Sequence, residues 1–419
     1  MTDTDAAAPG AFDGARAAAS DVLLSRIVRE EAGRIVGSLT AWTGSFDVAE
    51  DAVAEAVLEA LAQWRRRGIP ANPGGWLLQA ARHNALDRLR REKRYREKLA
   101  QLVAEPTVTA GGPDVDERLP LLFGCCHPAL SADAQLALTL RAVCGLTTAQ
   151  IARATFSTQE AVAQRIVRAK RKIAAAGIPI RIPEAESLLA RVDIVLTVIS
   201  VMYSEAHLVA GGDAGADRDL AEDAVWLARV VAAALPREAE AQGLLALLLL
   251  HRAREGGRAV DGELVLLAAQ DRSRWDSRLI AEGRRALARA ATLRRPGRWQ
   301  LHAAIAACHC DARTAAETDW LQVLTLYDML LAYDATPVVR LNRAVALAEV
   351  AGPAAALAEV DALRTALERS HLWHAVRARM LREVGRQDEA LAEDLVALEL
   401  TANEAERRLL AARVGGGQA

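Results

Sequence analysis

The chain has 419 residues and a formal net charge of -2, with 52% hydrophobic but only 4% aromatic residues. This length allows two to four domains with cores of their own. The longest apolar run, residues 243–250, is far too short to cross a bilayer. Because strand-like runs of β-branched residues bounded by turns are almost absent, the composition also argues against a β-sheet protein and predicts an all-α fold.

The net charge says little about partners, because it averages a basic N-terminal part against an acidic, alanine-rich remainder. Residues 1–19 are polar and rich in Gly and Ala, so we expect a disordered lead-in there. They carry no secretory signal. Five cysteines, an odd number, favour free thiols in a reducing compartment. We therefore expect a cytoplasmic protein with no membrane partner.

The first folded domain is expected over residues 20–98. A helix over residues 21–39 has an apolar stripe that includes Val22, Leu23, Ile27, Ile35 and Val36. A second helix over residues 47–65 has a stronger stripe and an opposite acidic face. The stripe consists of Val48, Ala52, Val53, Ala56, Val57, Ala60, Leu61 and Trp64. The acidic face begins with Asp47, Glu50 and Asp51, which the helix dipole alone would also favour.

A turn with Pro70, Pro73, Gly74 and Gly75 precedes a basic helix over residues 76–98. Its expected packing side contains Leu78, Ala81, Ala85, Leu86 and Leu89. Arginines and lysines occupy the other faces. Asn84 and Asp87 are three residues apart, so they share a face and could hydrogen-bond an unstacked base. The alternative is an ordinary solvated basic helix.

A linker is predicted over residues 99–115 and a second domain over residues 116–177. Within this domain, Thr147 or Thr148 begins a short helix, and Ser157 or Thr158 begins a basic one. Helix, short turn and basic helix form the pattern of a helix-turn-helix, although a plain helical hairpin gives the same pattern. Cations suited to DNA phosphates gather on the second helix, namely Arg165, Arg168, Lys170, Arg171 and Lys172.

Residues 178–419 are predicted to be helical almost throughout. ALAEVAGPAAALAEV aligns with RMLREVGRQDEALAED at an offset of 34 residues, counted from Glu349 to Glu383. This is the tetratricopeptide period, with small residues where paired helices would cross. Only two clear copies are visible, so the rest of this extension is expected to be degenerate repeats or other helical packing.

The segment AEDAVAEAVLEALAQW, followed by a turn and GGWLLQAARHNALDRLRREKR, resembles region two of the bacterial sigma factors of the extracytoplasmic-function group. The resemblance implies that Asp47, Glu50 and Asp51 bind the clamp coiled coil of core RNA polymerase. It implies that the basic helix melts promoter DNA and reads the element nearest the start site. The DNA contacts so implied are Trp76, Arg82, Asn84, Asp87, Arg90, Arg91 and Lys93.

The segment LTTAQIA followed by VAQRIVRAKRKI resembles region four of the same sigma factors, which reads the distal promoter element. Its implied base contacts are Gln159, Glu160, Gln164 and Arg165, and its implied phosphate contacts include Arg168 and Lys172. The turn ATFSTQEA departs from the commoner form, which contains Gly. Further segments of the extension resemble the subgroup with a tetratricopeptide-like C-terminal extension, which implies that the extension governs activity and could bind a regulatory protein.

Two Cys/His groups are candidate metal sites: Cys125, Cys126 and His127, and then His302, Cys308, His309 and Cys310. Neither has a paired C-x-x-C spacing, so buried small side chains are favoured and no metal or cofactor is expected. Glu263, Asp271 and Trp275 in GELVLLAAQDRSRW include no nucleophile with its base, and capping or helix pairing is the favoured role.

The sequence thus predicts a three-part all-α sigma factor that is not an enzyme and that recognises and opens promoter DNA together with RNA polymerase. Two other functions fit parts of the pattern. One is a helix-turn-helix regulator that binds duplex DNA without polymerase. The other is a tetratricopeptide adaptor that binds a protein partner.

Overall fold

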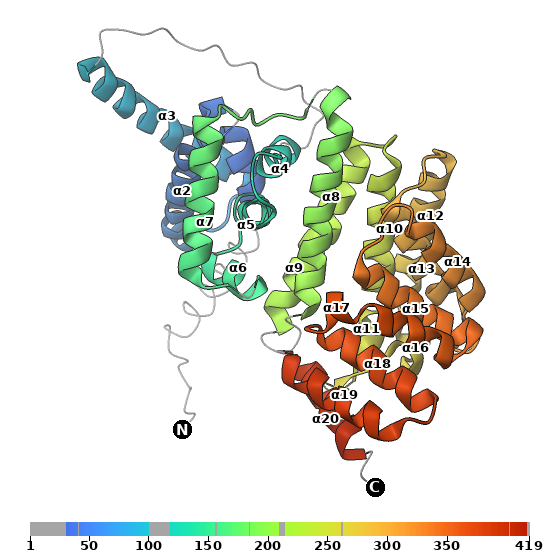
Figure 1. Ribbon diagram of the computed structural model, residues 1–419. Coiled ribbons are helices and arrows are strands. Elements are labelled where there is room, and N and C mark those ends of the chain that lie inside the picture. The colour runs from blue at the N-terminus through green and yellow to red at the C-terminus, as the bar shows by residue number, and fades with distance from the viewer. Residues whose placement is uncertain are drawn as a thin grey trace, which may run out of the picture. The chain divides into compact units, whose positions relative to one another are not determined.

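The computed structural model of the chain describes residues 31–40, 42–99, 118–155, 157–183, 185–208, 214–260, 263–401 and 403–416. Helices make up most of these residues, as Figure 1 shows. A short hairpin pairs β1 (Ala259–Val260) with β2 (Glu263–Leu264). The all-α prediction is confirmed. The predicted lead-in over residues 1–19 and most of the predicted linker lie outside the described residues, and so do Val22, Leu23 and Ile27.

The chain divides into two compact units, residues 1–198 and 199–419, and the boundary falls inside helix α8 (Ala185–Leu208). The domain boundary expected near residue 177 stays a prediction. No helix among the described residues combines the length and the apolar character that crossing a membrane requires.

In the first unit, α2 (Phe46–Arg67) packs against α3 (Pro73–Leu99). Ser45 caps α2 by accepting a hydrogen bond from the Val48 amide. The chain leaves α2 at Gly68, whose φ of 81° is readily adopted only by glycine. Small residues lie at the contact between the two helices, and Ala52, Ala56, Ala60, Ala81 and Ala85 are all at most 1% exposed.

The expected packing side of α3 needs one correction. Leu86 was placed on the buried stripe, but it is 37% exposed, whereas Leu77, which was not placed there, is buried. The helix is rotated so that Leu77, Ala81 and Ala85, at spacings of four, face the core.

Four helices follow in this unit: α4 (Arg118–Cys125), α5 (Ala132–Ala142), α6 (Thr148–Ala154) and α7 (Gln159–Ala175). Thr147 accepts a hydrogen bond from the Gln150 amide at the start of α6, and Thr158 accepts one from the Ala161 amide at the start of α7. Ser131 begins α5 without a side-chain capping bond. The predicted helix pair α6–α7 is therefore present, and α5 packs against both of its helices.

Helix α8 continues from the first unit into the second. Its Arg191 is buried and donates a hydrogen bond to the Phe123 carbonyl at the end of α4. Ile180, in the segment before α8, lies against Gly124, where a Cβ would be 2.4 Å from its Cδ1. The segment after α7 is thus part of the packing around α4.

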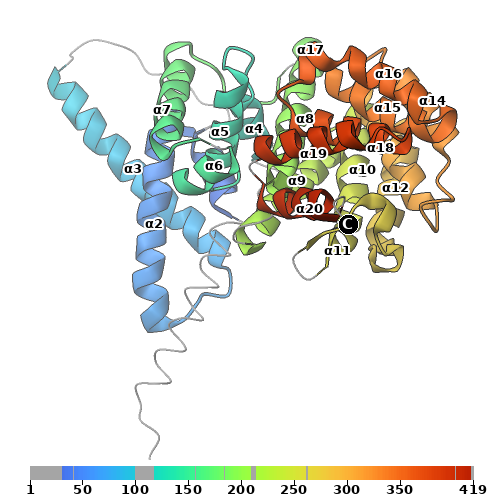
Figure 2. The ribbon, with the colours of Figure 1, turned by 60° about the horizontal axis from the view of Figure 1, so that its bottom comes forward.

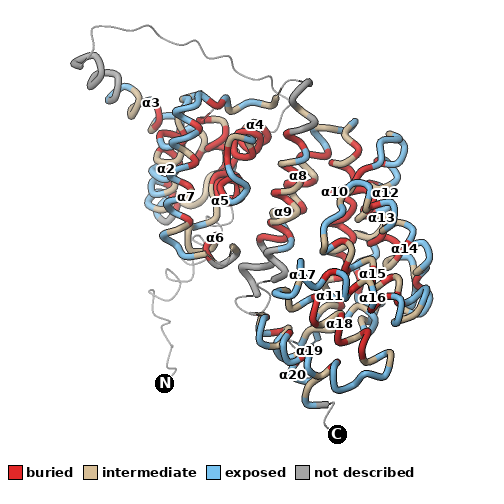
Figure 3. The backbone as a smooth tube through the Cα atoms, in the orientation of Figure 1, coloured by how far each residue is buried: buried red, intermediate tan, exposed pale blue. Residues whose placement is uncertain are grey.

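The second unit is built around α10 (Ala239–Ala253), which is buried along most of its length, as Figure 3 shows. It contacts α9 (Ala214–Ala234), α12 (Ser277–Thr292) and α13 (Arg298–Asp311). Gly243 lies against the Gln300 backbone and Gly283 against Leu250, so both contacts exclude a larger residue. Short elements separate α10 from α12: α11 (Glu255–Arg258), the hairpin and two 3-10 turns, Leu267–Ala269 and Arg272–Arg274.

The remaining helices are α14 (Trp320–Leu330), α15 (Pro337–Ala351), α16 (Pro353–Ala362), α17 (Arg364–Leu367), α18 (His371–Glu383), α19 (Gln387–Leu400) and α20 (Glu404–Gly416). The pairs α15–α16 and α18–α19 begin 34 residues apart, and α18 packs on both helices of the earlier pair (Figure 2). Both predicted copies are therefore helix pairs with the same spacing, although their helices differ in length.

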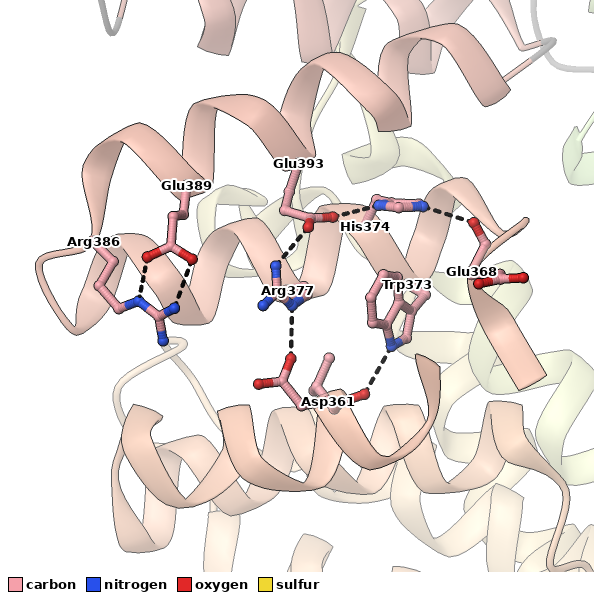
Figure 4. Close-up of polar contacts among 9 residues, drawn as sticks. Asp361, Glu368, Trp373, His374, Arg377, Arg386, Glu389 and Glu393 are labelled. Atoms are coloured by element: carbon pink, nitrogen blue, oxygen red, sulfur yellow. Dashed lines mark hydrogen bonds and ion pairs between the residues drawn. The ribbon is translucent and has the colours of Figure 1, made fainter. Parts of the chain in front are cut away.

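An ion pair between partly or fully buried side chains repeats with the same period. Arg343 lies 2.6 Å from Glu359 in the first copy, and Arg377 lies 2.5 Å from Glu393 in the second. Figure 4 shows that Arg377 also contacts Asp361 and that His374 contacts Glu393. Each arginine joins its own helix pair to the element before it, because Arg343 also contacts Asp328 of α14.

Candidate nucleic-acid interface

Helix α3 presents a basic face beyond its contact with α2. Arg82, Arg90 and Arg91 are exposed, as phosphate binding requires. Lys93 lies in the last part of the helix, outside the described side chains. The described arginines share the helix with the two predicted base contacts.

Asn84 and Asp87 are half-buried at the edge of this face, Asn84 on the side of α2, and both have contacts within the chain. The Asn84 amide donates to Glu59 Oε1 at 3.1 Å and to the Ala52 carbonyl at 3.4 Å, both on α2. Asp87 lies 3.5 Å from His83 and 3.6 Å from Arg90. The contacts with Glu59, His83 and Arg90 are exposed polar contacts of low energy, so a base could replace them at small cost.

Trp76 has a packing role in the structure. Its ring meets that of Trp64 edge-to-face, with centroids 5.5 Å apart. This contact joins the start of α3 to the end of α2 and fixes how the basic helix leaves the turn. A contact of Trp76 with DNA stays a prediction.

The predicted polymerase-binding acids lie along α2 and differ in exposure. The Asp47 side chain is 78% exposed, that of Asp51 48% and that of Glu50 only 21%. Asp51 is 2.5 Å from Arg88 of α3, a residue that the sequence analysis gave no role. Leu58 is 66% exposed among these acids. An acidic surface with one apolar side chain suits a protein partner more than DNA.

Helix α7 has one buried and one exposed face. Val162, Ile166, Ala169 and Ile173 are buried against the rest of the unit. Glu160, Gln164, Arg168 and Arg171 are exposed at spacings of three and four, and exposed Gln159 and Lys172 flank them. Val167 is 44% exposed within this face and was missed by the sequence analysis, although its phase along the helix places it there. An apolar side chain there could contact a thymine methyl group.

Two predicted DNA contacts on α7 are engaged within the chain. Arg165 is 3.4 Å from Asp133 of α5, and only 26% of its side chain is exposed. Lys170 is 2.5 Å from Glu50 and 3.2 Å from Asp47, and only 13% of its side chain is exposed. Contacts of either residue with DNA remain predictions, and each would require its present ion pair to break.

The Lys170 contact links the two predicted reading modules. It brings a cation of α7 onto the acidic face of α2, 120 residues away in sequence from Glu50. The backbones also come close, since a Cβ at Gly33 would lie 2.1 Å from the Val143 carbonyl oxygen. The surface that was expected to bind polymerase and the helix that was expected to bind DNA therefore cover each other in part.

The cysteines are free thiols, of which Cys125, Cys126, Cys144 and Cys308 are buried. Burial raises the pKa of Cys126 to about 12 and that of Cys310 to about 11, so both are protonated at neutral pH. They pack as small apolar side chains. Across the described ranges, no three His, Cys, Asp or Glu residues are grouped as a metal site would require.

The first unit therefore has two helices with exposed basic faces. Helix α3 is paired with α2, and α7 is the second helix of a helix-turn-helix. These features define a helical DNA-binding protein with two reading modules. Comparison with known families identifies both modules. Residues 27–95 match Sigma-70 region 2, and residues 121–173 match Sigma-70, region 4. Residues 191–291 match a family of unknown function (DUF6596).

An uncharacterized protein of Rhizobium meliloti (strain 1021) is 39% identical over 382 residues, which cover 88% of this chain and 90% of the relative. No solved structure matches the chain. The chain belongs to the sigma factors of the extracytoplasmic-function type that carry a C-terminal extension. Its two sigma regions make it a transcription-initiation protein and imply RNA polymerase and promoter DNA as partners.

The exposed face of α7 leads to a prediction about salt dependence. We expect Arg168→Ala to weaken binding to promoter and non-promoter duplexes by the same factor and to lower the slope of log K against log salt by about 1, because one phosphate contact is lost. Arg168 suits this test because, among the described residues, its side chain bonds only to the Gln164 carbonyl of its own helix. Fluorescence anisotropy over a range of salt concentrations measures both quantities. Arg285→Ala, at an exposed arginine of α12, is the control. A loss confined to promoter DNA would contradict the phosphate role.

Proposed function

We propose that this chain binds core RNA polymerase through the acidic face of α2, places α7 on the distal promoter element and opens the DNA with α3. The observation that carries the proposal is the occurrence of both sigma regions in order on one chain, each with an exposed basic helix face. The polymerase supplies the bond chemistry, and this chain supplies promoter choice and strand opening.

The proposed roles follow the exposure and charge of the side chains. Asp47, Glu50 and Asp51 would bind the polymerase. Arg82, Arg90 and Arg91 would bind phosphates near the melted region, and Asn84 and Asp87 would hold an extruded base. On α7, exposed Gln159, Glu160 and Gln164 would read base edges, while Arg168, Arg171 and Lys172 would bind phosphates.

The contact of Lys170 with Glu50 and Asp47 gives the free chain a state that must open before polymerase binds through these acids. The opening cost is modest, because Asp47 is already 78% exposed and the separated charges return to water or to new partners. Lys170 therefore tunes polymerase affinity by a few-fold and does not abolish it. After opening, Lys170 would be free to contact a phosphate, as its sequence context predicts.

Start-site-specific transcription is the first test. Core polymerase plus this chain should give run-off transcripts of defined length, which neither a duplex-binding regulator nor a protein adaptor would produce. We expect Asn84→Ala to reduce open-complex formation about tenfold, the effect of losing one base-edge contact worth about 1–3 kcal/mol, with polymerase binding unchanged. Permanganate footprinting of the melted region measures open complexes.

Glu59→Ala is the matched control for Asn84, because it removes the side-chain partner of Asn84 and leaves the asparagine in place. If Asn84 acts on DNA, Glu59→Ala should leave strand opening intact. An equal loss of strand opening in both variants would show that the contact with α2 matters and that base binding does not.

Removal of the Lys170 charge tests the contact between the reading modules. Lys170→Ala should raise the affinity for core polymerase, measured without DNA, by a factor of about 2–5, because two acids of α2 lose a competing cation. Lys172→Ala, an exposed lysine two residues away, should leave the affinity unchanged. Unchanged or weaker polymerase binding by Lys170→Ala would refute the competition.

We further propose that the C-terminal extension governs activity, acts in the cytoplasm and offers its helix pairs as a tetratricopeptide-like surface to a regulatory protein. Two helix pairs at the 34-residue period, each joined to the preceding helix by a repeated arginine, support the repeat assignment. Because both sigma regions and the extension belong to one chain, even a weak contact would act at high effective concentration.

Truncation tests the role of the extension. A chain that ends at Val198 keeps the whole first unit, and we expect it to bind core polymerase but to lose most run-off transcription. A chain that ends at Pro183 also loses Arg191, the buried donor to the Phe123 carbonyl, so it should be less stable as well. Transcript levels equal to those of the full chain, at equal amounts of the Val198 form, would refute regulation by the extension.

A further inference from the structure

One buried arginine of the extension has no acceptor for its charge. Arg254 follows α10 and is only 9% exposed. Its Nε is fully buried with no hydrogen-bond partner, and no carboxylate or carbonyl among the described residues accepts from its guanidinium. The contact that it does make is with the Trp275 ring, whose centroid is 5.5 Å from the guanidinium carbon.

The other buried arginines of the chain show what this one lacks. Arg377 is 6% exposed and is bound by both Asp361 and Glu393, and Arg191 is 9% exposed and donates to the Phe123 carbonyl. A buried guanidinium normally requires such partners, because it carries five donors and a full charge. Arg254 is as buried as these two arginines but lacks their carboxylate or carbonyl acceptors.

The neighbouring charges make the uncompensated positive charge of Arg254 less favourable. Burial is the main cause that lowers its pKa to about 10, and Arg258 and Arg272 lower it further. Burial also lowers the pKa of His309 to about 4, with smaller effects of Arg254 and Arg272. The site therefore gathers three guanidinium groups beside a histidine that is neutral at physiological pH.

Three acids of the neighbouring segments are engaged elsewhere. Glu255 pairs with Arg252, Asp271 caps the following turn by accepting from Ser273, and Glu263 pairs with Arg408. Arg272 is held by the carbonyls of His309 and Ala312, each at 2.6 Å, and its guanidinium carbon lies 4.9 Å from the Trp275 ring centroid. Arg272 therefore places a second guanidinium beside the Trp275 ring, and among the described residues the Arg254 and Arg258 guanidinium groups have no hydrogen bond or ion pair.

Exposure increases from Arg254 toward its neighbours. Arg258, Arg272 and His309 are half-buried, whereas Arg254 and Trp275 are buried. Gly257 packs so closely on Trp275 that a Cβ would lie 2.7 Å from the indole Nε1, so the ring cannot move toward α11. Arg254 is thus a buried cation beside a fixed aromatic ring, and the other cations lie nearer the solvent. This arrangement fits a ligand whose negatively charged end binds at Arg254.

We propose that Arg254 and Arg258, beside the Trp275 ring, form a binding site in the extension for a small oxyanion, the phosphate group of a small molecule. A phosphate dianion supplies the negative charge that the guanidinium groups lack, and its oxygens are enough acceptors for both of them. The site is inferred independently of the proposed role in transcription, and its test has no transcription readout.

The test compares thermal unfolding of the full chain in inorganic phosphate and in chloride at equal ionic strength. Phosphate should raise the unfolding midpoint of the extension by roughly 2–4 °C and give a saturable heat in titration calorimetry. Acetate at the same concentration tests a carboxylate in place of phosphate. A rise with acetate and not with phosphate would overturn the phosphate assignment.

Variants assign the effect to the site. Arg254→Met should fold, because it replaces an unpaired buried charge by an apolar chain of similar length, and it should lose the phosphate-dependent rise. Arg254→Lys keeps the charge without the paired donors and should lose most of the rise. Arg285→Met, at an exposed arginine of α12, should respond as the unchanged chain does. The proposal is wrong if phosphate acts no better than chloride, or if Arg254→Met and the unchanged chain respond alike.

Discussion

Alanine and glycine at the helix contacts set how closely the helices of this chain pack. Ala52, Ala56 and Ala60 of α2 meet Ala81 and Ala85 of α3, all with at most 1% exposure. In the extension, Gly243 and Gly283 allow α13 and α12 to approach α10. Because side chains this small fill little space, the backbones must come together, which buries the apolar stripes and turns the long polar side chains outward. The basic faces of α3 and α7 depend on this packing.

Charged side chains form further contacts between helices, in addition to the packing of small residues. Lys170 joins α7 to the acidic face of α2, Arg191 joins α8 to the end of α4, and Arg377 joins successive helix pairs of the extension. These contacts differ in burial. The Lys170 contacts include Asp47, which is 78% exposed and is solvated by water when they open, whereas breaking the buried Arg377 cluster would leave a charge uncompensated. The Lys170 contact therefore suits a contact that opens when a partner binds, and the Arg377 cluster suits one that stays closed in the folded chain.

Much of the fold was predictable because helix formation depends mainly on residues that are close in sequence. The apolar period of residues 47–65, the Pro and Gly turn before α3, and the threonines that begin α6 and α7 each depend on near neighbours. The repeat offset of 34 residues was also visible, since small residues recur at equal spacing. Leu86 shows the limit of this reasoning. Leu77 and Leu86 fit the helical period about equally well, and only contact with α2 decides which is buried.

The sequence by itself determined the helices, the order of the two reading modules and the residue types on their exposed faces, because these depend on spacing along one chain. Tertiary structure alone decided that Lys170 faces Glu50, that Asn84 is bonded to Glu59 and that Arg254 is buried without an acid. Each of these depends on residues from 25 to 120 positions away, or on their absence from the described surroundings. A residue's charge is written in the sequence, but its partner and its exposure to water are set only when distant helices pack.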